Sequence, residues 1–241
     1  MTHTLARRAA AEFLGSAFLV AAVVGSGIMG QRLSNGNVAL ALLCNSVATG
    51  AALVALILTF GPISGAHFNP VVTLSDAIEK GMIWSDVPAY ICVQILGGIV
   101  GTVAAHVMFG LPVISLSSHV RSGSAQIFSE FIATFGLLSV IWGCSRLRSD
   151  SVPFAVGAYI TAAYWFTSST SFANPAVTIA RCLTNTFAGI RPRDVIPFAL
   201  AQLLGGITAT VVFRLFIPKS QHQTKEILMP QSLERPARPN A

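Results

Sequence analysis

The sequence predicts an all-α membrane protein in which six transmembrane helices and two half-helices form an inverted repeat of three plus three. Composition gives the first reason, because the chain of 241 residues is 53% hydrophobic and only 10% charged, whereas soluble domains carry about 25% charged residues. Six charge-poor stretches are also long enough to cross a bilayer, which takes about 20 residues. Finally, the motifs of the first half of the chain return in the same order in the second half.

The expected spans are separated by short polar segments. They cover residues 9–30, 38–59, 87–109, 126–145, 153–169 and 195–217. Glu12 interrupts the first span, which also runs longer than the apolar core of a secretory signal, so we expect it to remain as a helix. Together the spans form one channel domain, 9–217, between an N-terminal segment, 1–8, and a flexible cytoplasmic tail, 218–241, that is rich in proline and polar residues.

Basic residues predict the orientation, because short loops rich in Lys and Arg stay in the cytoplasm. They gather before the first span, between the fourth and fifth, and after the sixth, at Arg7, Arg8, Arg146, Arg148, Lys219 and Lys225. Arg191 and Arg193 lie on the opposite side and weaken the bias. We therefore expect a multi-pass protein of the cell's plasma membrane with both termini in the cytoplasm. The net charge of +6 is not clustered into a patch for nucleic acid.

Matched motifs define the repeat. Glu12 and Glu130 each precede a phenylalanine early in a span, and Gln94 and Gln202 each begin a Gln-x-x-Gly-Gly element. The two copies cover about 9–110 and 126–217. Since each copy holds three spans, an odd number, the second copy must enter the membrane from the opposite side.

The strongest motif is a duplicated Asn-Pro, in His67-Phe68-Asn69-Pro70-Val71-Val72-Thr73-Leu74 and Phe172-Ala173-Asn174-Pro175-Ala176-Val177-Thr178-Ile179. Proline suits the first helical turn and asparagine is a favoured N-cap, so each copy begins a half-helix too short to span. The inversion brings the two N-termini together near the midplane, where irregular backbone must line a cavity or be buried in protein. We expect a pore constriction there, formed by Asn69, Pro70, Val71, Asn174, Pro175 and Ala176.

This junction is suited to neutral solutes. Each helix N-terminus carries about half a positive charge, which repels a cation. The side-chain amides of Asn69 and Asn174 can donate to a solute oxygen, while carbonyl groups of the preceding loops accept. A file of water molecules must reorient at the centre, which interrupts proton relay along it.

With these motifs the chain resembles the aquaporin and glycerol-facilitator (major intrinsic protein) family over about residues 8–217. The resemblance rests on the segment from Ser64 to Pro70, the second Asn-Pro-Ala, the paired glutamates and the Gln-x-x-Gly-Gly elements. It implies a right-handed bundle that assembles into a homotetramer with one pore per subunit. It also implies that Glu12 and Glu130 brace the irregular loops, proton relay being the alternative, and that His67 lines the cytoplasmic vestibule or braces its loop.

Two positions depart from the family pattern. Val71 stands where alanine is usual, and Val177 stands directly after the second Asn-Pro-Ala, where family members carry an arginine that narrows the outer filter. Arg181 follows one helical turn later, about 6 Å along the half-helix. It either supplies positive potential to the outer vestibule or serves as a structural ion pair or a snorkelling side chain.

Spacing from the Asn-Pro sites locates the other walls of the outer filter. Counting back places Thr49 where water-selective members carry a bulky aromatic residue, and places Ser171 on the loop. The fifth span contributes Ala162 or Tyr164, depending on the alignment used. The small side chains at 49, 171 and 177 predict a wide filter, with hydroxyl groups that replace the water contacts shed by an entering solute.

The expected function is a passive channel for small uncharged solutes, namely water, glycerol-like polyols, urea and neutral metalloid species such as arsenite. A narrow water-selective channel is one alternative, and a secondary transporter that moves protons on Glu12 or Glu130 is another. An enzyme is disfavoured, because no metal-ligating cluster or activated nucleophile can be assembled from the chain. We expect no cofactor and no metal, with small solutes and the lipid bilayer as partners.

Overall fold

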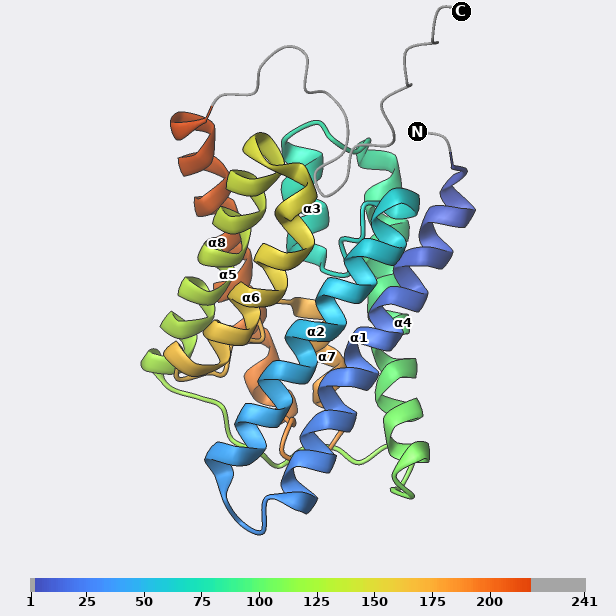
Figure 1. The fold of residues 1–241 in the computed structure, drawn as a ribbon, viewed down its shortest axis with the longest axis vertical. Helices are drawn as coiled ribbons and strands as arrows, with labels where there is room; N and C mark the ends of the chain where they lie inside the picture. The colour runs from blue at the N-terminus through green and yellow to red at the C-terminus, as the bar shows by residue number, and fades with distance from the viewer. Residues whose placement is uncertain (1–2, 218–241) are drawn as a thin grey trace, which may run out of the picture.

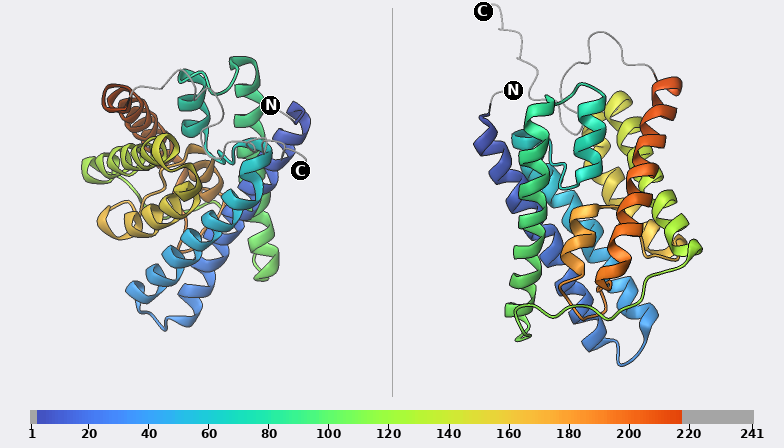
Figure 2. Two further views of the ribbon diagram at one scale, coloured as in Figure 1. Left: turned by 45° about the horizontal axis from the view of Figure 1, so that its top comes forward. Right: turned by 180° about the vertical axis from the view of Figure 1, so that it is seen from behind.

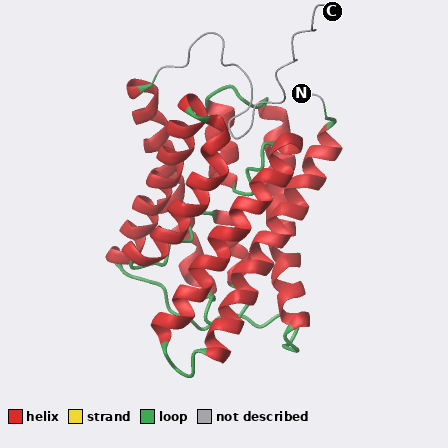
Figure 3. Cartoon of the chain, viewed as in Figure 1, coloured by secondary structure: helices red, strands yellow, loops and turns green. Residues whose placement is uncertain are grey.

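The computed structural model describes residues 3–217, which fold into a bundle of eight α-helices (Figure 1). In chain order these are α1 (Leu5–Leu33), α2 (Val38–Ser64), α3 (Pro70–Ile78), α4 (Val87–Met108), α5 (Ser124–Leu147), α6 (Val152–Phe166), α7 (Pro175–Arg181) and α8 (Pro192–Phe216). Two 3-10 helices, η1 (Trp84–Asp86) and η2 (Ser149–Ser151), lead into α4 and α6. No strand occurs in this part of the chain (Figure 3), so the predicted all-α fold is confirmed.

Five helices of the described part are long and apolar enough to cross a membrane, namely α1, α2, α4 together with η1, α5 and α8. The helix expected at 153–169 is shorter than predicted, because α6 has 15 residues and rises only about 22 Å. It ends at Phe166, where the chain turns into the loop before α7. The first helix begins earlier than predicted, at Leu5 with Thr4 as its N-cap, and the expected tail 218–241 lies outside the described residues.

Each repeat packs its first long helix along its last. Helix α1 lies along α4 in the first repeat, and α5 lies along α8 in the second. A Cβ atom on Gly97 would lie 2.3 Å from the carbonyl oxygen of Phe13. In the second repeat, a Cβ atom on Gly205 would lie 2.4 Å from the carbonyl oxygen of Phe131. The glycines of both Gln-x-x-Gly-Gly elements thus let the helix pairs approach to distances that no larger residue permits.

The short helices α3 and α7 lie inside the bundle, one in each half of the molecule (Figure 2). They contact each other where the two halves meet. Helix α1 begins and α8 ends at the same end of the bundle (Figure 1). Two inverted copies of three membrane helices produce this arrangement, since the second copy runs through the bundle in the opposite sense.

Candidate functional site

Both half-helices begin at an Asn-Pro pair. Asn69 is the N-cap of α3, and its Oδ1 accepts a hydrogen bond from the backbone N–H of Val71 at 2.9 Å. Asn174 is the N-cap of α7, and its Oδ1 accepts from Ala176 at 3.0 Å. Each proline occupies the first helical turn, where its missing N–H costs nothing. The duplicated motif therefore folds twice into the same local structure.

The two caps also join the repeats. The side-chain nitrogen of Asn69 donates to the carbonyl oxygen of Ala173 at 2.8 Å, and that of Asn174 donates to the carbonyl oxygen of Phe68 at 2.7 Å. A side-chain amide carries two hydrogens, so one hydrogen on each asparagine is left for a molecule between them. Both asparagines line an internal cavity.

Buried carboxylates hold the strained loops that lead into the half-helices. Five non-glycine residues of these loops adopt left-handed backbone conformations, with φ between +48° and +63° at Ala66, Phe68, Thr170, Ser171 and Ala173, which costs roughly 1–2 kcal/mol for each. Glu12 accepts from the backbone N–H groups of His67 and Phe68 at 2.9 and 2.7 Å. Glu130 accepts from those of Phe172 and Ala173, both at 2.9 Å. These charge-assisted hydrogen bonds offset the backbone strain.

A glutamine completes each network. Gln94 donates to Glu12 at 2.8 Å and to the hydroxyl of Thr73 at 2.9 Å. Gln202 donates to Glu130 at 2.6 Å and to the hydroxyl of Thr178 at 2.9 Å. The repeated motifs of the sequence are therefore brought together in space, each carboxylate surrounded by donors from its own repeat.

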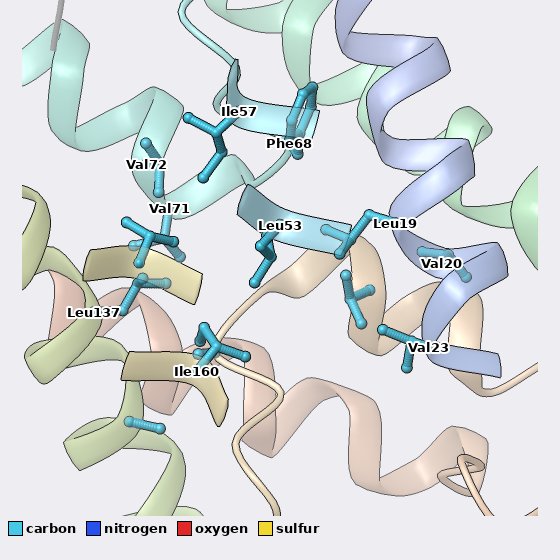
Figure 4. Packing of buried hydrophobic residues seen from close by; sticks show 14 of the residues in the cluster. Leu19, Val20, Val23, Leu53, Ile57, Phe68, Val71, Val72, Leu137 and Ile160 are labelled. Atoms are coloured by element: carbon cyan, nitrogen blue, oxygen red, sulfur yellow. The ribbon is translucent and has the colours of Figure 1, made fainter. Parts of the chain in front are cut away.

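The cavity runs past both Asn-Pro sites and has a mixed lining. Its volume is about 60 Å³, and since about 10–15 Å³ is enough to hold one water molecule, it is large enough for several. One wall is apolar and includes Leu53 and Ile57 from α2, Leu137 from α5 and Ile160 from α6 (Figure 4). The rest of the lining includes the irregular loops and the two asparagines. A solute that enters thus meets both hydrogen-bonding groups and hydrocarbon.

The end of the cavity next to α7, termed the Val177 end, contains three hydroxyl groups. Thr49, Tyr164, Ser171 and Val177 all line it. The hydroxyls of Thr49 and Tyr164 lie 3.2 Å apart and form a hydrogen bond. The hydroxyl of Ser171 is buried and has no hydrogen-bond partner in the structure. Of the two residues expected from the fifth span, Tyr164 reaches the cavity, whereas Ala162 is exposed on the outer face of α6.

The expected constriction includes residues that do not reach the cavity. Pro70, Val71, Pro175 and Ala176 are buried but do not line it. Val71 instead faces α8, where a Cβ atom on Gly206 would lie 2.1 Å from its Cγ1. Successive helical residues turn by about 100°, so Val72 and Val177 line the cavity in their place. The extra methyl groups of Val71 are thus accommodated by a glycine, away from the pore.

The other end of the cavity, termed the His67 end, carries a histidine and a carboxylate. His67 lines the cavity, and its Nε2 lies 3.6 Å from Oδ2 of Asp76. Its Nδ1 is hydrogen-bonded to the hydroxyl of Thr73 at 3.1 Å. His67 therefore faces the cavity and also ties its own loop to α3.

Arg181 lies at the Val177 end and is only 2% exposed. Its guanidinium carbon lies 3.4 Å from the centre of the Phe172 ring, and its Nε donates to the carbonyl oxygen of Ala188. Among the described residues it forms no ion pair. The structural ion pair considered from the sequence is therefore absent from this part of the chain, and the arginine lines the cavity.

Sequence reasoning missed a second arginine at this end. Arg121 lies in the connector between α4 and α5, with its guanidinium carbon 4.9 Å from the centre of the Phe172 ring. It donates to the carbonyl oxygens of Gly189 and Ser169 at 2.8 and 2.9 Å. Burial and the nearby charge of Arg181 lower the pKa of Arg121 to about 9, so it stays charged at neutral pH. The connector carries no repeated motif, so no sequence pattern pointed to this residue.

Comparison with known proteins now identifies the family. The family described as "Major intrinsic protein" matches residues 1–162 and 144–235. The chain belongs to the major intrinsic protein family. Membership in this family, together with five long apolar helices in the described part, makes it a multi-pass membrane protein and a channel rather than an enzyme.

Individual relatives agree with this family assignment. Aquaglyceroporin AqpS of Rhizobium meliloti (strain 1021) is 53% identical over 210 residues, which are 87% of this chain and 90% of that protein. Aquaporin NIP3-1 of Oryza sativa subsp. japonica is 30% identical over 217 residues, covering 87% of this chain and 68% of the relative. The X-ray structure of the aquaglyceroporin from Plasmodium falciparum has a TM-score of 0.71 and 18% identity, over 89% of this chain and 98% of that one. This last likeness shows the shared fold of the major intrinsic proteins.

Proposed function

We propose that this major intrinsic protein is a passive channel for small uncharged solutes and that its outer filter is wide enough for polyols. The observation that carries the proposal is the set of residues at the Val177 end, where Thr49, Tyr164, Ser171 and Val177 line the cavity. An arginine at position 177 and an aromatic ring at position 49 would fill that space. Their absence leaves room for solutes larger than water.

The mixed lining of the cavity supports polyols as one substrate class. Glycerol exposes hydroxyl groups along one edge and carbon atoms along the other. The hydroxyls of Thr49, Tyr164 and Ser171 replace water contacts that a solute sheds on entry, which matters because an unmade hydrogen bond costs about 1–3 kcal/mol. Urea and arsenous acid share the small size, neutrality and hydrogen-bonding groups of glycerol. The similarity to proteins called aquaglyceroporins supports the same class.

The buried glutamates are fitted to brace loops and not to carry protons. Glu12 accepts four hydrogen bonds, from the hydroxyl of Ser64, two backbone N–H groups and Gln94. Glu130 accepts three, from two backbone N–H groups and Gln202. Protonation would remove acceptors that hold the strained loops in place. This arrangement favours a pore over a proton-coupled transporter.

We further propose that the protein lies in the plasma membrane as a homotetramer with both termini in the cytoplasm. The basic residues of the sequence support this orientation. The Val177 end then faces the outside and the His67 end faces the cytoplasm. A solute entering from outside meets the hydroxyl groups first and the two asparagines next.

Stopped-flow measurements on purified protein in phosphatidylcholine vesicles test the proposal. The wild-type protein should conduct glycerol and arsenous acid well above empty vesicles, with a flux that rises linearly with concentration. Val177→Arg should reduce glycerol flux by about tenfold, because overfilling such a site costs about 1–3 kcal/mol, and should reduce water flux less. Val177→Ala is the matched control and should leave both fluxes near wild type. Equal loss of glycerol and water flux in Val177→Arg would contradict the wide filter.

A further inference from the structure

The two arginines at the Val177 end have no part in the size filter, and their placement suggests a separate task. We propose that Arg181, supported by Arg121, is the charge barrier that excludes cations from this channel. The inference rests on the proposed function, since it assigns the residue that keeps a pore for neutral solutes closed to ions. Size and charge are then selected by different residues, with Val177 leaving the filter wide and Arg181 supplying the positive charge one helical turn away.

Arg181 is held in a fixed position beside the path of a solute. It lines the cavity together with Val177. The ring of Phe172 supports its guanidinium at 3.4 Å, and the carbonyl oxygen of Ala188 accepts a hydrogen bond from its Nε. Because a guanidinium stacks well on an aromatic face, the side chain is held against the ring. The charge is therefore present at the cavity in a fixed position.

Arg181 forms no ion pair with a carboxylate in the described part of the chain. The oxygens of Glu130 accept hydrogen bonds from Phe172, Ala173 and Gln202, and the charge of Glu130 attracts the guanidinium only over a longer distance. Asp194 is paired with Arg191 at 2.7 Å. Part of the positive potential of the guanidinium therefore extends into the cavity that Arg181 lines. A cation that has shed part of its water there meets this potential at low dielectric, where electrostatic repulsion is strongest.

Arg121 does not line the cavity, but it brings a second positive charge close to Arg181. Its guanidinium lies 4.9 Å from the same Phe172 ring and is fixed by the carbonyl oxygens of Ser169 and Gly189. Bringing two buried guanidinium groups to one aromatic ring costs free energy through mutual repulsion. A structure that only needed to pack this corner of the molecule would do so at lower cost with apolar residues. The cost of placing two guanidinium groups at one ring is explained if their positive potential is needed to exclude cations.

The experiment compares glycerol flux with leakage of potassium ions and protons in vesicles of phosphatidylcholine. In Arg181→Gln the potassium and proton leakage should rise about tenfold or more, given the strength of unit charges at low dielectric, whereas glycerol flux should change far less than this. Arg181→Lys keeps the charge and should stay close to wild type. The double variant Val177→Arg with Arg181→Gln restores an arginine to the cavity wall and should recover ion exclusion while losing glycerol flux.

Arg32 provides the matched control. It also lies over a phenylalanine, with its guanidinium carbon 5.2 Å from the Phe109 ring, and it donates to a carbonyl oxygen. It is exposed and does not line the cavity, so Arg32→Gln should change neither flux. Potassium leakage that stays at the wild-type level in Arg181→Gln, with glycerol flux retained, would overturn the inference.

A second variant covers the case in which Arg181→Gln does not fold. Phe172→Leu keeps the charge but removes its aromatic support, so potassium leakage should rise several-fold while glycerol flux persists. Potassium leakage at the wild-type level in this variant would show that the contact between Arg181 and the Phe172 ring is not needed to exclude cations. If instead the wild-type protein conducts no glycerol, the proposed function fails, which is a different outcome from failure of the charge barrier.

Discussion

The two ends of the cavity share a scaffold but carry opposite chemistry at matched positions. In each repeat, the loop residue two positions before the asparagine contacts the half-helix residue seven positions after it. In the first repeat this pair is His67 and Asp76, 3.6 Å apart. In the second it is Phe172 and Arg181, with the guanidinium 3.4 Å from the ring centre. The same geometry thus places an acid at one end and a base at the other.

The comparison separates the residues that hold the two repeats in shape from the residues that differ between them. The glutamates, the capping asparagines, the Gln-x-x-Gly-Gly glutamines and the half-helix threonines make equivalent hydrogen bonds in both repeats. These residues fix the loops and bring the two halves together. Under the proposed function, selectivity depends on the positions that differ between the copies, which can change without disturbing the scaffold.

The largest expected effect tests the shared scaffold. Glu12→Gln and Glu130→Gln should each destabilise the protein by about 3–5 kcal/mol, because each breaks a buried charged network. Glu12 accepts one more hydrogen bond than Glu130, so Glu12→Gln should be worse by about 1 kcal/mol. Thermal unfolding in detergent measures both. The comparison is wrong if Glu130→Gln proves the more damaging change.

A smaller effect tests how α3 and α7 pack against the opposite repeat. Gly206→Ala should destabilise the protein by about 1–3 kcal/mol, because the new methyl group would lie 2.1 Å from Val71. Gly98→Ala, the matched change, should cost clearly less, since its nearest contact would be Ala180 at 3.1 Å.

Combining Gly206→Ala with Val71→Ala should recover much of the lost stability, because the second change removes the methyl group that clashes. Unfolding midpoints of the single and double variants measure this coupling. Strict additivity of the two changes would show that Val71 does not face Gly206.

A bulky side chain introduced on α2 tests whether the Val177 end of the cavity lies on the path of the solute. Thr49→Phe should lower glycerol flux by about tenfold, as expected for overpacking worth about 1–3 kcal/mol, and should lower water flux less. Thr59→Phe places the same ring on the exposed face of α2 and is the control. Unchanged glycerol flux in Thr49→Phe would remove Thr49 from the path of the solute.

The smallest expected effect concerns pH, because potassium exclusion should not change between pH 7 and pH 8. Burial and Arg181 lower the pKa of Arg121 to about 9, and burial and nearby arginines lower the pKa of His119 below its usual 6.5. A base titrates around its pKa, so between pH 7 and pH 8 Arg121 stays charged and His119 stays neutral. Potassium exclusion should therefore be flat over this interval in a vesicle leakage assay. A steep change would mean that another titrating group controls the barrier.

Much of the scaffold was predictable from the sequence because it is encoded by local, repeated signals. An asparagine before a proline marks a helix start, and motifs that return in the same order mark an inverted repeat. The fold and the caps at Asn69 and Asn174 follow from these signals, whereas the loop contacts of Glu12 and Glu130 were expected from the family resemblance. Each depends on residues close in sequence or on the symmetry of the repeat.

The features that the sequence did not predict depend on the direction of single side chains. Val71 turns toward Gly206 and away from the pore. This direction depends only on the angular position of residue 71 around the axis of α3. Tyr164 faces the cavity while Ala162 faces outward, a choice that gaps in an alignment obscure. Arg121 reaches the Val177 end from a connector without periodicity. Such long-range contacts leave no pattern along the chain.

The most direct test of the central claim is the ratio of glycerol to potassium permeability in two variants measured in the same vesicles. Val177→Arg should lower glycerol permeability and leave potassium leakage unchanged, because it fills the filter. Arg181→Gln should raise potassium leakage far more than it changes glycerol permeability, because it removes the charge. If either variant changes both permeabilities together, size and charge are not selected by separate residues, and the account of the Val177 end is contradicted.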